Sequence, residues 1–240
     1  MLRGQMTRLV LVLVLATSVA ARAQNCERPA GASGQGVAGL SDEARLAFLS
    51  KHLSEESVRS HNWILAWGAI YAGLGIGQLA LMPLFTREEQ PDWYWGAAGT
   101  GVGLAFTLLG RPEVLEAGPL YAKKASTVSP EDRCALIAEG ERMLGSGAEA
   151  EEGGFAWYLH VGNVLFNVGL SLILGLGYNH WQGAIINFAV GTAIGEANIL
   201  SAPAHLISGW KRYQKGGSPE AVSVHVIPTA GPGVGVLMTF

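Results

Sequence analysis

The chain alternates between long stretches without charged side chains and polar stretches. Residues 62–86 and residues 93–110 contain no Asp, Glu, Lys or Arg, and neither do residues 153–195. A bilayer-spanning helix needs about 20 apolar residues, so the third stretch is long enough for two spans. The segment YNHWQG, residues 178–183, is the natural turn between them. The pattern predicts four transmembrane helices, over residues 63–85, 94–110, 157–177 and 182–204.

The tryptophans support this division, because amphipathic rings prefer the membrane–water interface. All seven lie near an end of a predicted helix: Trp63, Trp67, Trp93, Trp95, Trp157, Trp181 and Trp210. Each predicted span also carries two small residues four positions apart, a spacing that lets membrane helices approach closely. These pairs are Gly73/Gly77, Gly99/Gly103, Ser171/Gly175 and Gly191/Gly195. The sequence therefore predicts a tightly packed bundle.

The polar stretches predict short helices and a hairpin outside the membrane. Residues 41–60 place three leucines on one face behind Ser41, a favourable N-cap residue. Residues 129–144, SPEDRCALIAEGERML, begin with a strong helix-start signal, and the acidic GSGAEAEEGG after them indicates a hinge. Residues 222–240 alternate apolar and polar positions around a turn at 229–233, which is typical of a β-hairpin.

The fold class is thus predicted as a mainly α membrane protein: a four-transmembrane-helix bundle with an extramembrane helical loop and a C-terminal β-hairpin. Its predicted parts are a signal peptide (1–23), a flexible leader with an amphipathic helix (24–61), a first transmembrane hairpin (62–110), an extracytoplasmic loop with a helix (111–156), a second transmembrane hairpin (157–205) and a tail (206–240).

The N-terminus has the three parts of a secretory signal. Arg3 and Arg8 precede an apolar run that is too short to span a bilayer, and Ala-Arg-Ala at 21–23 fits a cleavage site. Asn25 is bulky and polar where a lipid-attachment signal requires a small residue before the cysteine, so cleavage before Gln24 is expected rather than acylation.

A cleaved signal places the mature chain in an oxidising compartment, where disulfides form. The chain has two cysteines, Cys26 and Cys134, and we expect a bridge between them. The alternative is two separate thiols, one of them buried in a helix.

Orientation rests on two signals that disagree. The signal peptide puts residues 111–156 and the C-terminus outside, on the periplasmic side of an inner membrane. The positive-inside rule opposes this, because the predicted inner turns hold only Arg87, whereas Arg111, Lys211 and Arg212 flank the outer ends. We follow the signal peptide. The conflict leaves open that the helices form hairpins inserted from the outer side.

Charge and motifs exclude several function classes. Charged residues make up 15% of the chain and the net charge is −3, which leaves no basic surface for nucleic acid. Phosphate-loop, zinc-protease, C-x-x-C and nucleophile-elbow motifs are absent. The GQGVAG segment at 34–39 follows no predicted strand and is not expected to bind a dinucleotide. We predict neither enzymatic activity nor a metal or cofactor.

One polar set lies inside the last two spans. His160, Asn163 and Asn167 share a face of the third span, while the fourth carries Glu196 and, on another face, Asn198. Glu196 lies about 12 Å from the outer end of its helix, a depth that Asn163 and Asn167 match on the antiparallel neighbour. Three interpretations stand: a carboxyl bonded across helices, a site on a ligand or ion pathway, or a wet residue at an early helix end.

We therefore expect an integral membrane protein of the bacterial cell envelope, acting as a non-enzymatic structural or interaction component. Its expected partners are the lipid bilayer, other envelope proteins, or further copies of itself through the glycine-rich helix faces. The alternative is a small oligomeric transporter or channel that uses Glu196.

Overall fold

A computed structural model describes residues 26–28, 39–110, 114–216, 223–228 and 234–239. The predicted signal peptide, residues 1–23, lies outside this part of the chain. The elements are α1 (Asp42–Leu81), η2 (Met82–Leu84), α2 (Gln90–Leu109), α3 (Val114–Ala125), α4 (Arg133–Gly154), α5 (Trp157–Leu172), a π-helical segment η3 (Ile173–Gly177), α6 (Trp181–Leu200), α7 (His205–Gln214), β1 (Ser223–Pro228) and β2 (Val234–Thr239).

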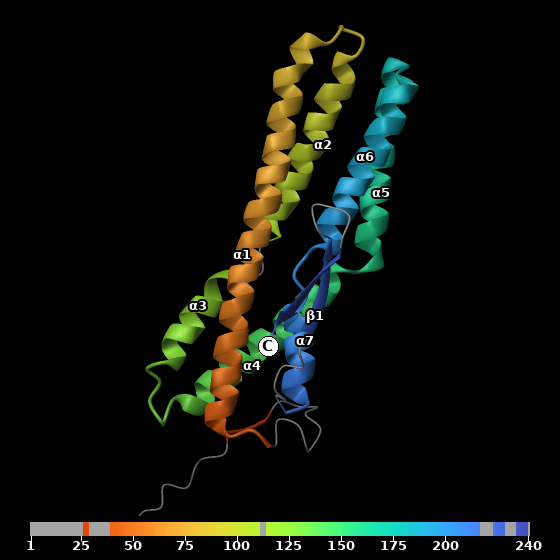
Figure 1. The fold of residues 1–240 in the computed structure, drawn as a ribbon. Helices are drawn as coiled ribbons and strands as arrows, with labels where there is room; N and C mark the ends of the chain where they lie inside the picture. The colour runs from red at the N-terminus through yellow and green to blue at the C-terminus, as the bar shows by residue number, and fades with distance from the viewer. Residues whose placement is uncertain (1–25, 29–38, 111–113, 217–222, 229–233, 240) are drawn as a thin grey trace, which may run out of the picture.

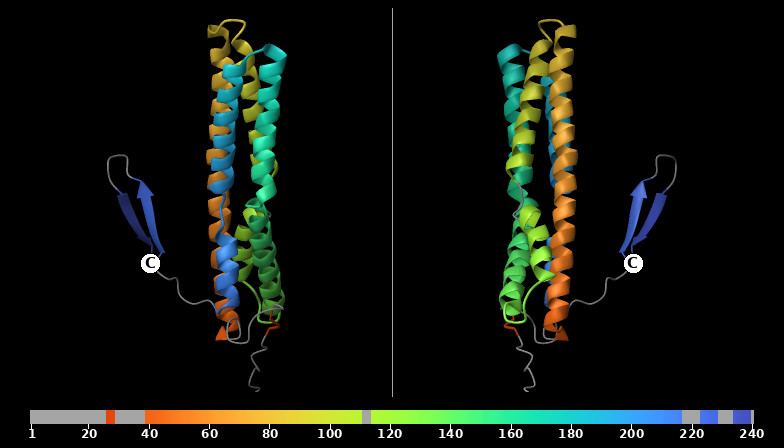
Figure 2. Two further views of the ribbon diagram at one scale, coloured as in Figure 1. Left: turned by 90° about the vertical axis from the view of Figure 1, so that its right-hand side faces the viewer. Right: turned by 90° about the vertical axis from the view of Figure 1, so that its left-hand side faces the viewer.

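The helices form two tiers stacked end to end (Figure 1). We call the first the apolar tier: residues 62–81 of α1, together with α2, α5 and α6. The polar tier comprises residues 42–61 of α1 with α3, α4 and α7. The side views in Figure 2 show the same division. Both helical hairpins turn at the end of the apolar tier that lies away from the polar tier.

Helix α1 runs through both tiers as one continuous helix of 40 residues, roughly 60 Å long. The prediction of a separate amphipathic helix and a transmembrane span was therefore wrong at this junction. Residues 54–67 contain no glycine or proline, so nothing interrupts the helix where its composition changes. Its predicted start holds, since Ser41 Oγ accepts a hydrogen bond from the Ala44 amide at 3.2 Å.

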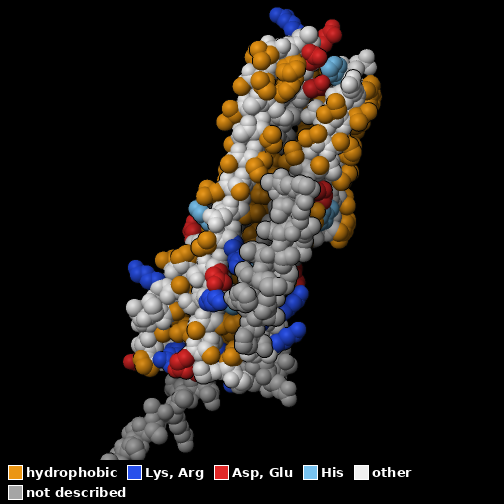
Figure 3. Space-filling model, in the orientation of Figure 1, with side chains coloured by type: hydrophobic (Ala, Val, Ile, Leu, Met, Phe, Trp, Pro, Cys, Tyr) orange, Lys and Arg blue, Asp and Glu red, His pale blue; other side chains and the backbone are white. Residues whose placement is uncertain are grey.

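Three helical stretches are long and apolar enough to cross a membrane, which indicates a membrane protein. They are Asp42–Leu84, Trp157–Gly177 and Trp181–Gln214. The predicted count of four is not supported, because α2 falls short on composition: Asp92 and the polar ends of Trp93, Tyr94 and Trp95 in its first turns lower its mean hydropathy. Hydrophobic side chains nonetheless cover the visible face of the apolar tier, and charged ones gather at its ends and on the polar tier (Figure 3).

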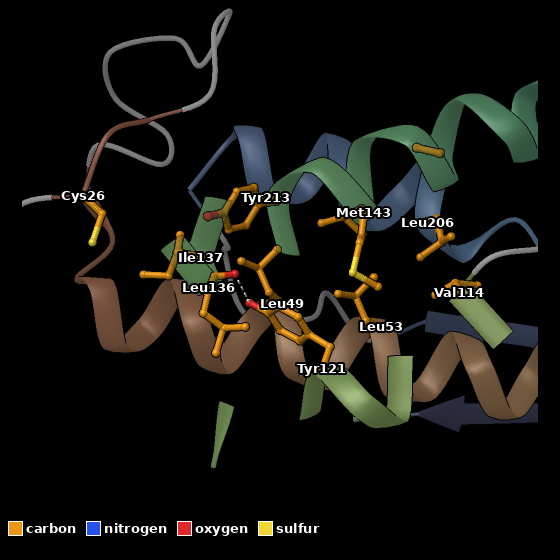
Figure 4. Packing of buried hydrophobic residues seen from close by; sticks show 12 residues of the cluster. Cys26, Leu49, Leu53, Val114, Tyr121, Leu136, Ile137, Met143, Leu206 and Tyr213 are labelled. Carbon is orange, nitrogen blue, oxygen red and sulfur yellow. Dashed lines mark hydrogen bonds between the residues drawn. The ribbon is translucent and has the colours of Figure 1, made fainter. Parts of the chain in front are cut away.

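The polar tier has its own hydrophobic core. Leu49 and Leu53 of α1 are fully buried against α3, α4 and α7, with Tyr121 and Ile137 beside them (Figure 4). Tyr121 Oη donates a hydrogen bond to the Leu136 carbonyl at 3.1 Å, so its polar end is also satisfied. Burying a side chain of this size contributes about 1.5–3 kcal/mol, which makes this cluster the main stabilising feature of the tier.

A buried ionic network joins four parts of the polar tier. Arg45 is 0% exposed, and its Nη2 lies 2.5 Å from Oε1 of Glu141 on α4. Its Nε donates to Tyr213 Oη on α7 at 3.1 Å, and its Nη1 donates to the Cys26 carbonyl at 3.1 Å. Cys26 and Cys134 lie at disulfide distance, with sulfur atoms 2.01 Å apart. Cys26, α1, α4 and α7 are thus fixed to one another.

Two elements of the polar tier differ from expectation. The predicted hinge at residues 145–154 is helical and completes α4. One of its glycines serves packing, because a Cβ at Gly147 would lie 2.5 Å from Leu206 Cδ1. Helix α3 was not predicted, since it contains Gly118 and Pro119. Gly118 is needed there, as a Cβ would meet the Leu53 carbonyl oxygen at 2.4 Å.

The predicted small-residue pairs differ in whether another helix packs against them. A Cβ at Gly103 would lie 2.6 Å from Tyr71 of α1, which shows close packing between α1 and α2. At Gly73 and Gly77, by contrast, no atom of the described residues lies within 4 Å. That pair therefore does not mediate helix packing within one copy of the described chain. Farther along, β1 and β2 pair antiparallel, with Ser223 opposite Thr239 and Val226 opposite Val236.

Candidate functional site

The predicted polar set of the last two spans meets between α5 and α6. His160 Nδ1 lies 2.5 Å from Glu196 Oε2, and Asn163 Nδ2 donates to Glu196 Oε1 at 2.9 Å. The antiparallel arrangement of the two helices brings these side chains to one depth. Both oxygens of the intramembrane carboxylate are thus bonded across the helix pair.

The two asparagines extend this contact into a ladder along α5. Asn163 Nδ2 also donates to the Thr192 carbonyl at 3.0 Å, and Asn167 Nδ2 donates to Asn163 Oδ1 at 3.0 Å. A Cβ at Gly191 or Gly195 would lie 2.1 Å from the amide oxygen of Asn167 or Asn163. These glycines are therefore required because the amides pack directly on the α6 backbone. We call this set of bonded residues, His160, Asn163, Asn167 and Glu196, the clamp, because it joins α5 to α6.

Asn198 is not part of this clamp. Its Nδ2 is buried, and among the described residues it has no hydrogen-bond partner. Thr192 Oγ1 is in the same situation. Buried polar atoms are normally bonded to protein or water, so the Asn198 donor is an exception among the described residues.

A second ion pair fixes the two hairpins to each other at the end away from the polar tier. His180 Nδ1 lies 2.9 Å from Asp92 Oδ2, and the carboxylate packs over Gly183. Sequence reasoning missed this contact, because it treated His180 as part of a turn and left Asp92 just outside the second predicted span. A carboxylate and an imidazole at neighbouring span ends were the available signal.

Below this ion pair the hairpins separate and leave a cleft of about 870 Å³. The hairpin of α1 and α2 forms one wall and the hairpin of α5 and α6 the other. The surface is mostly apolar, with aromatic rings such as Tyr71, Phe106 and Phe166 interspersed with glycines. Ligand pockets commonly have volumes of roughly 300–1,000 Å³ and mostly apolar walls. No pattern in the sequence pointed to this cleft, because it depends on how the hairpins are placed.

The predicted site residues divide around the cleft. Asn163, Asn167 and Asn198 line it, whereas Glu196 and His160 are not among its lining residues. Glu196 is 28% exposed at its side chain and lies on another face of α6. The carboxylate singled out from the sequence therefore belongs to the clamp but does not line the cleft, and the cleft meets the clamp only through Asn163 and Asn167.

A carboxylate, that of Glu151, marks the end of the cleft beside the polar tier, and Glu56 is buried nearby. Glu151 of α4 lines it and accepts a hydrogen bond from the Ile207 amide at 3.0 Å. Burial, with a smaller contribution from the nearby Glu56, raises the pKa of the Glu151 carboxyl to about 7. Glu56 itself is 1% exposed.

Two cysteines and a carboxylate in the polar tier lie close enough together to hold a metal ion, but their surroundings do not suit a cation. Cys26, Asp42 and Cys134 present ligand atoms within 4.8 Å of one another. The two sulfur atoms lie at bonding distance from each other, and Asp42 Oδ1 lies 3.0 Å from the buried guanidinium of Arg45. A cation would face this positive charge, so the group fits a structural role.

Comparisons with family models, with curated proteins and with solved structures find no match for this chain, and the cleft and the clamp stand on their own geometry.

Proposed function

We propose that this chain is a non-enzymatic integral membrane protein of the bacterial cell envelope that holds the acyl chain of a membrane lipid between its two helical hairpins. The observation that carries the proposal is the apolar cleft of about 870 Å³ between the hairpins. Most of its wall residues lie in the apolar tier, where three helical stretches are suited to a membrane.

The cleft is reached from the lipid side. Phe106 and Leu109, which line it near the end of α2, are 76% and 84% exposed. On the side of α1 and α6, the indole N–H groups of Trp63 and Trp67 donate to Ser201 Oγ at 3.2 and 2.9 Å. The α1–α6 side is therefore bridged, while lipid chains surround the open side. An acyl chain is the apolar occupant present there at the highest concentration.

We further propose that α2 crosses the membrane with the other three helices, that the C-terminal strands form the predicted hairpin, and that the polar tier lies on the periplasmic side. The support is positional. Residues 26–28, residues 114–154 and α7 all lie at one end of the bundle, as a cleaved signal followed by four spans requires (Figure 1). The Cys26–Cys134 pair lies at that end, where an oxidising compartment would suit it.

The test introduces a large side chain on one wall of the cleft, so that the side chain takes the place of a bound acyl chain. Gly162 of α5 lines the cleft, and no neighbouring atom of the described residues lies within 4 Å of the place where its Cβ would be. Gly162→Phe should occupy the space of the acyl chain without disturbing the helix pair. Gly169→Phe is the matched control, because Gly169 lies on the same helix with equally open surroundings and does not line the cleft.

The measurement is photocrosslinking in nanodiscs doped with phosphatidylcholine that carries a photoreactive acyl chain. We expect label on cleft residues such as Phe106 and Phe166 in the wild type, a loss of about tenfold in Gly162→Phe, and no change in Gly169→Phe; a tenfold loss corresponds to ~1.4 kcal/mol. Label spread evenly over lipid-facing side chains and unaffected by Gly162→Phe would contradict the proposal.

The transporter alternative rests on Glu196, since an ionisable residue inside a span is a default site candidate. The clamp geometry favours a structural role instead. Flux of protons or of a small solute in liposomes distinguishes the two roles. If Glu196 is only structural, Glu196→Gln should leave the flux unchanged, and Glu196→Ala should lower the thermal stability of the protein. Flux in the wild type that Glu196→Gln abolishes would establish the transporter.

A further inference from the structure

Two carboxylates lie where α1, α4 and α7 meet, at the junction of the two tiers. Glu56 of α1 is 1% exposed, and Glu151 of α4 is partly buried and close enough to interact with it electrostatically. Ser60 Oγ donates a hydrogen bond to Glu56 Oε1 at 2.9 Å, and the Ile207 amide of α7 donates to Glu151 Oε2 at 3.0 Å. These donors are neutral groups, so they leave the charge of the pair uncompensated.

One oxygen of Glu56 lacks a donor altogether. Its Oε2 is fully buried and has no hydrogen-bond partner among the described residues. Burial without a partner costs an ionised oxygen far more than a neutral one, and a second negative charge nearby disfavours ionisation again. The geometry of the junction therefore favours a proton on the pair.

The charged and titratable side chains around the pair do not neutralise it. Arg59 lies near Glu56, but it is exposed and its Nη1 lies 2.8 Å from His205 Nε2 of α7. Because arginine can only donate, this imidazole nitrogen accepts and the ring is neutral. His205 Nδ1 is 3.8 Å from Glu56 Oε2, which is beyond hydrogen-bond distance. On α4 itself, Glu152 is exposed and pairs with Lys211 of α7.

The sign of the pH dependence follows from this environment. Burial, with a smaller contribution from Glu56, raises the pKa of Glu151 from 4.5 to about 7, and burial also raises the pKa of Glu56. A group with a raised pKa stabilises the folded protein fully below its unfolded pKa, and this stabilisation is lost as the pH rises through the folded value. For Glu151 the loss runs from about pH 4.5 to about pH 7.

We propose that Glu56 and Glu151 bind one proton between them, and that its release loosens the contact of α1 with α4 and α7. With the proton bound, the pair has a single negative charge beside the N-terminus of α7, where a helix favours one. Without it, two negative charges repel each other across the helix contact. Because Glu151 and Leu206 also line the cleft, the proton acts on the end of the cleft beside the polar tier, whatever the cleft holds.

Infrared difference spectra of the full chain test the proton directly, because a protonated carboxyl group has a C=O stretch that a carboxylate lacks. A maltoside detergent is suitable, since it contributes no carbonyl band. We expect the band of one carboxyl group at about pH 6, where exposed acids are ionised, and its loss by about pH 8. The double variant Glu56→Gln with Glu151→Gln should lack this band.

Two matched variants identify the source of the band. Glu152→Gln removes the exposed neighbour of Glu151 on the same helix, and Glu196→Gln removes the carboxylate of the clamp. Both should retain the band. A wild-type protein without a carboxyl band at about pH 6, or a band that persists in the double variant, would overturn the proposal. The wild-type spectrum needs no variant, so it is decisive even if a variant unfolds.

Thermal unfolding tests the loosening of the junction. Glu151→Gln removes the charge but keeps an acceptor for the Ile207 amide. At about pH 8 this variant should melt roughly 3–6 °C above the wild type, and at about pH 5.5 the two should melt alike. Comparison at equal pH cancels the titration of the histidines. A variant that melts no higher than the wild type at the alkaline pH would show that the carboxylate is only a structural acceptor.

Discussion

Arg45 shows how one residue can organise a whole tier. Its guanidinium is 0% exposed, and its partners come from the leader, α1, α4 and α7. A buried pair of this kind adds little stability over a well-packed apolar pair, but removing one partner leaves a charge buried alone. The network therefore acts mainly on specificity, by defining which segments fit together.

Arg45→Met should lower the free energy of unfolding by about 3–5 kcal/mol, because Glu141 is left buried without its countercharge. The double variant Arg45→Met with Glu141→Leu should recover much of this loss. Thermal and denaturant unfolding of the detergent-solubilised protein measure both. Lys124→Ala is the control: its pair with Glu139 is exposed, with Lys124 58% accessible, and should change stability by less than about 1 kcal/mol. A double variant as unstable as the single would contradict this account.

At the scale of elements, a glycine matters through what packs on it. Gly195 has the Asn163 amide on its surface, whereas Gly73 has no described atom within 4 Å of a would-be Cβ. Both belong to pairs with the same spacing, so the motif alone does not distinguish them. What distinguishes them is the asparagine side chain that the neighbouring helix packs on Gly195.

Gly195→Leu should destabilise the α5–α6 hairpin by roughly 1–3 kcal/mol, because the added side chain displaces the clamp amide. Gly73→Leu should be neutral or slightly stabilising, since glycine costs about 0.8–1 kcal/mol relative to a good helix former. Melting curves in detergent compare the two. Equal destabilisation would show that the clamp does not depend on close approach of the backbones.

Many of the helices and helix contacts could be predicted from the sequence. Uncharged runs and interfacial tryptophans locate the apolar parts of α1, α2, α5 and α6, and the spacing of Asn163 from His160 anticipates a shared face toward Glu196. The continuity of α1 could not be predicted, because a change in composition does not end a helix that lacks a breaker. Helix α3 was hidden by Pro119 and Gly118, whose positions make sense only against Leu53.

The cleft could not be predicted for a different reason. Its volume depends on how far two hairpins separate, and that distance is set by contacts between residues remote in sequence, such as Asp92 with His180. Patterns along one helix report which face is apolar, but not what lies opposite. The open groups at Glu56 and Asn198 become visible only once every neighbour has been placed.

At the scale of the whole molecule, the cysteine pair links the leader to α4 across 108 residues. Replacing both cysteines by serine should lower the free energy of unfolding by about 2–4 kcal/mol, mainly by releasing the unfolded chain. Non-reducing peptide mass spectrometry of protein taken from the envelope should find Cys26 joined to Cys134. Reduced wild-type protein should melt like the double variant; free thiols in the native protein would refute the bridge.

The reach of the Arg45 network also bears on how the protein is made. Arg45 and Tyr213 are separated by 168 residues, and the whole apolar tier lies between them in the sequence: residues 62–81 of α1, α2, α5 and α6. A chain still under synthesis, or one whose second hairpin has not been inserted, carries Arg45 and Glu141 without the tyrosine that completes their hydrogen bonds. The polar tier closes fully only after the last transmembrane segment is in place, so its closure reports that biogenesis is complete.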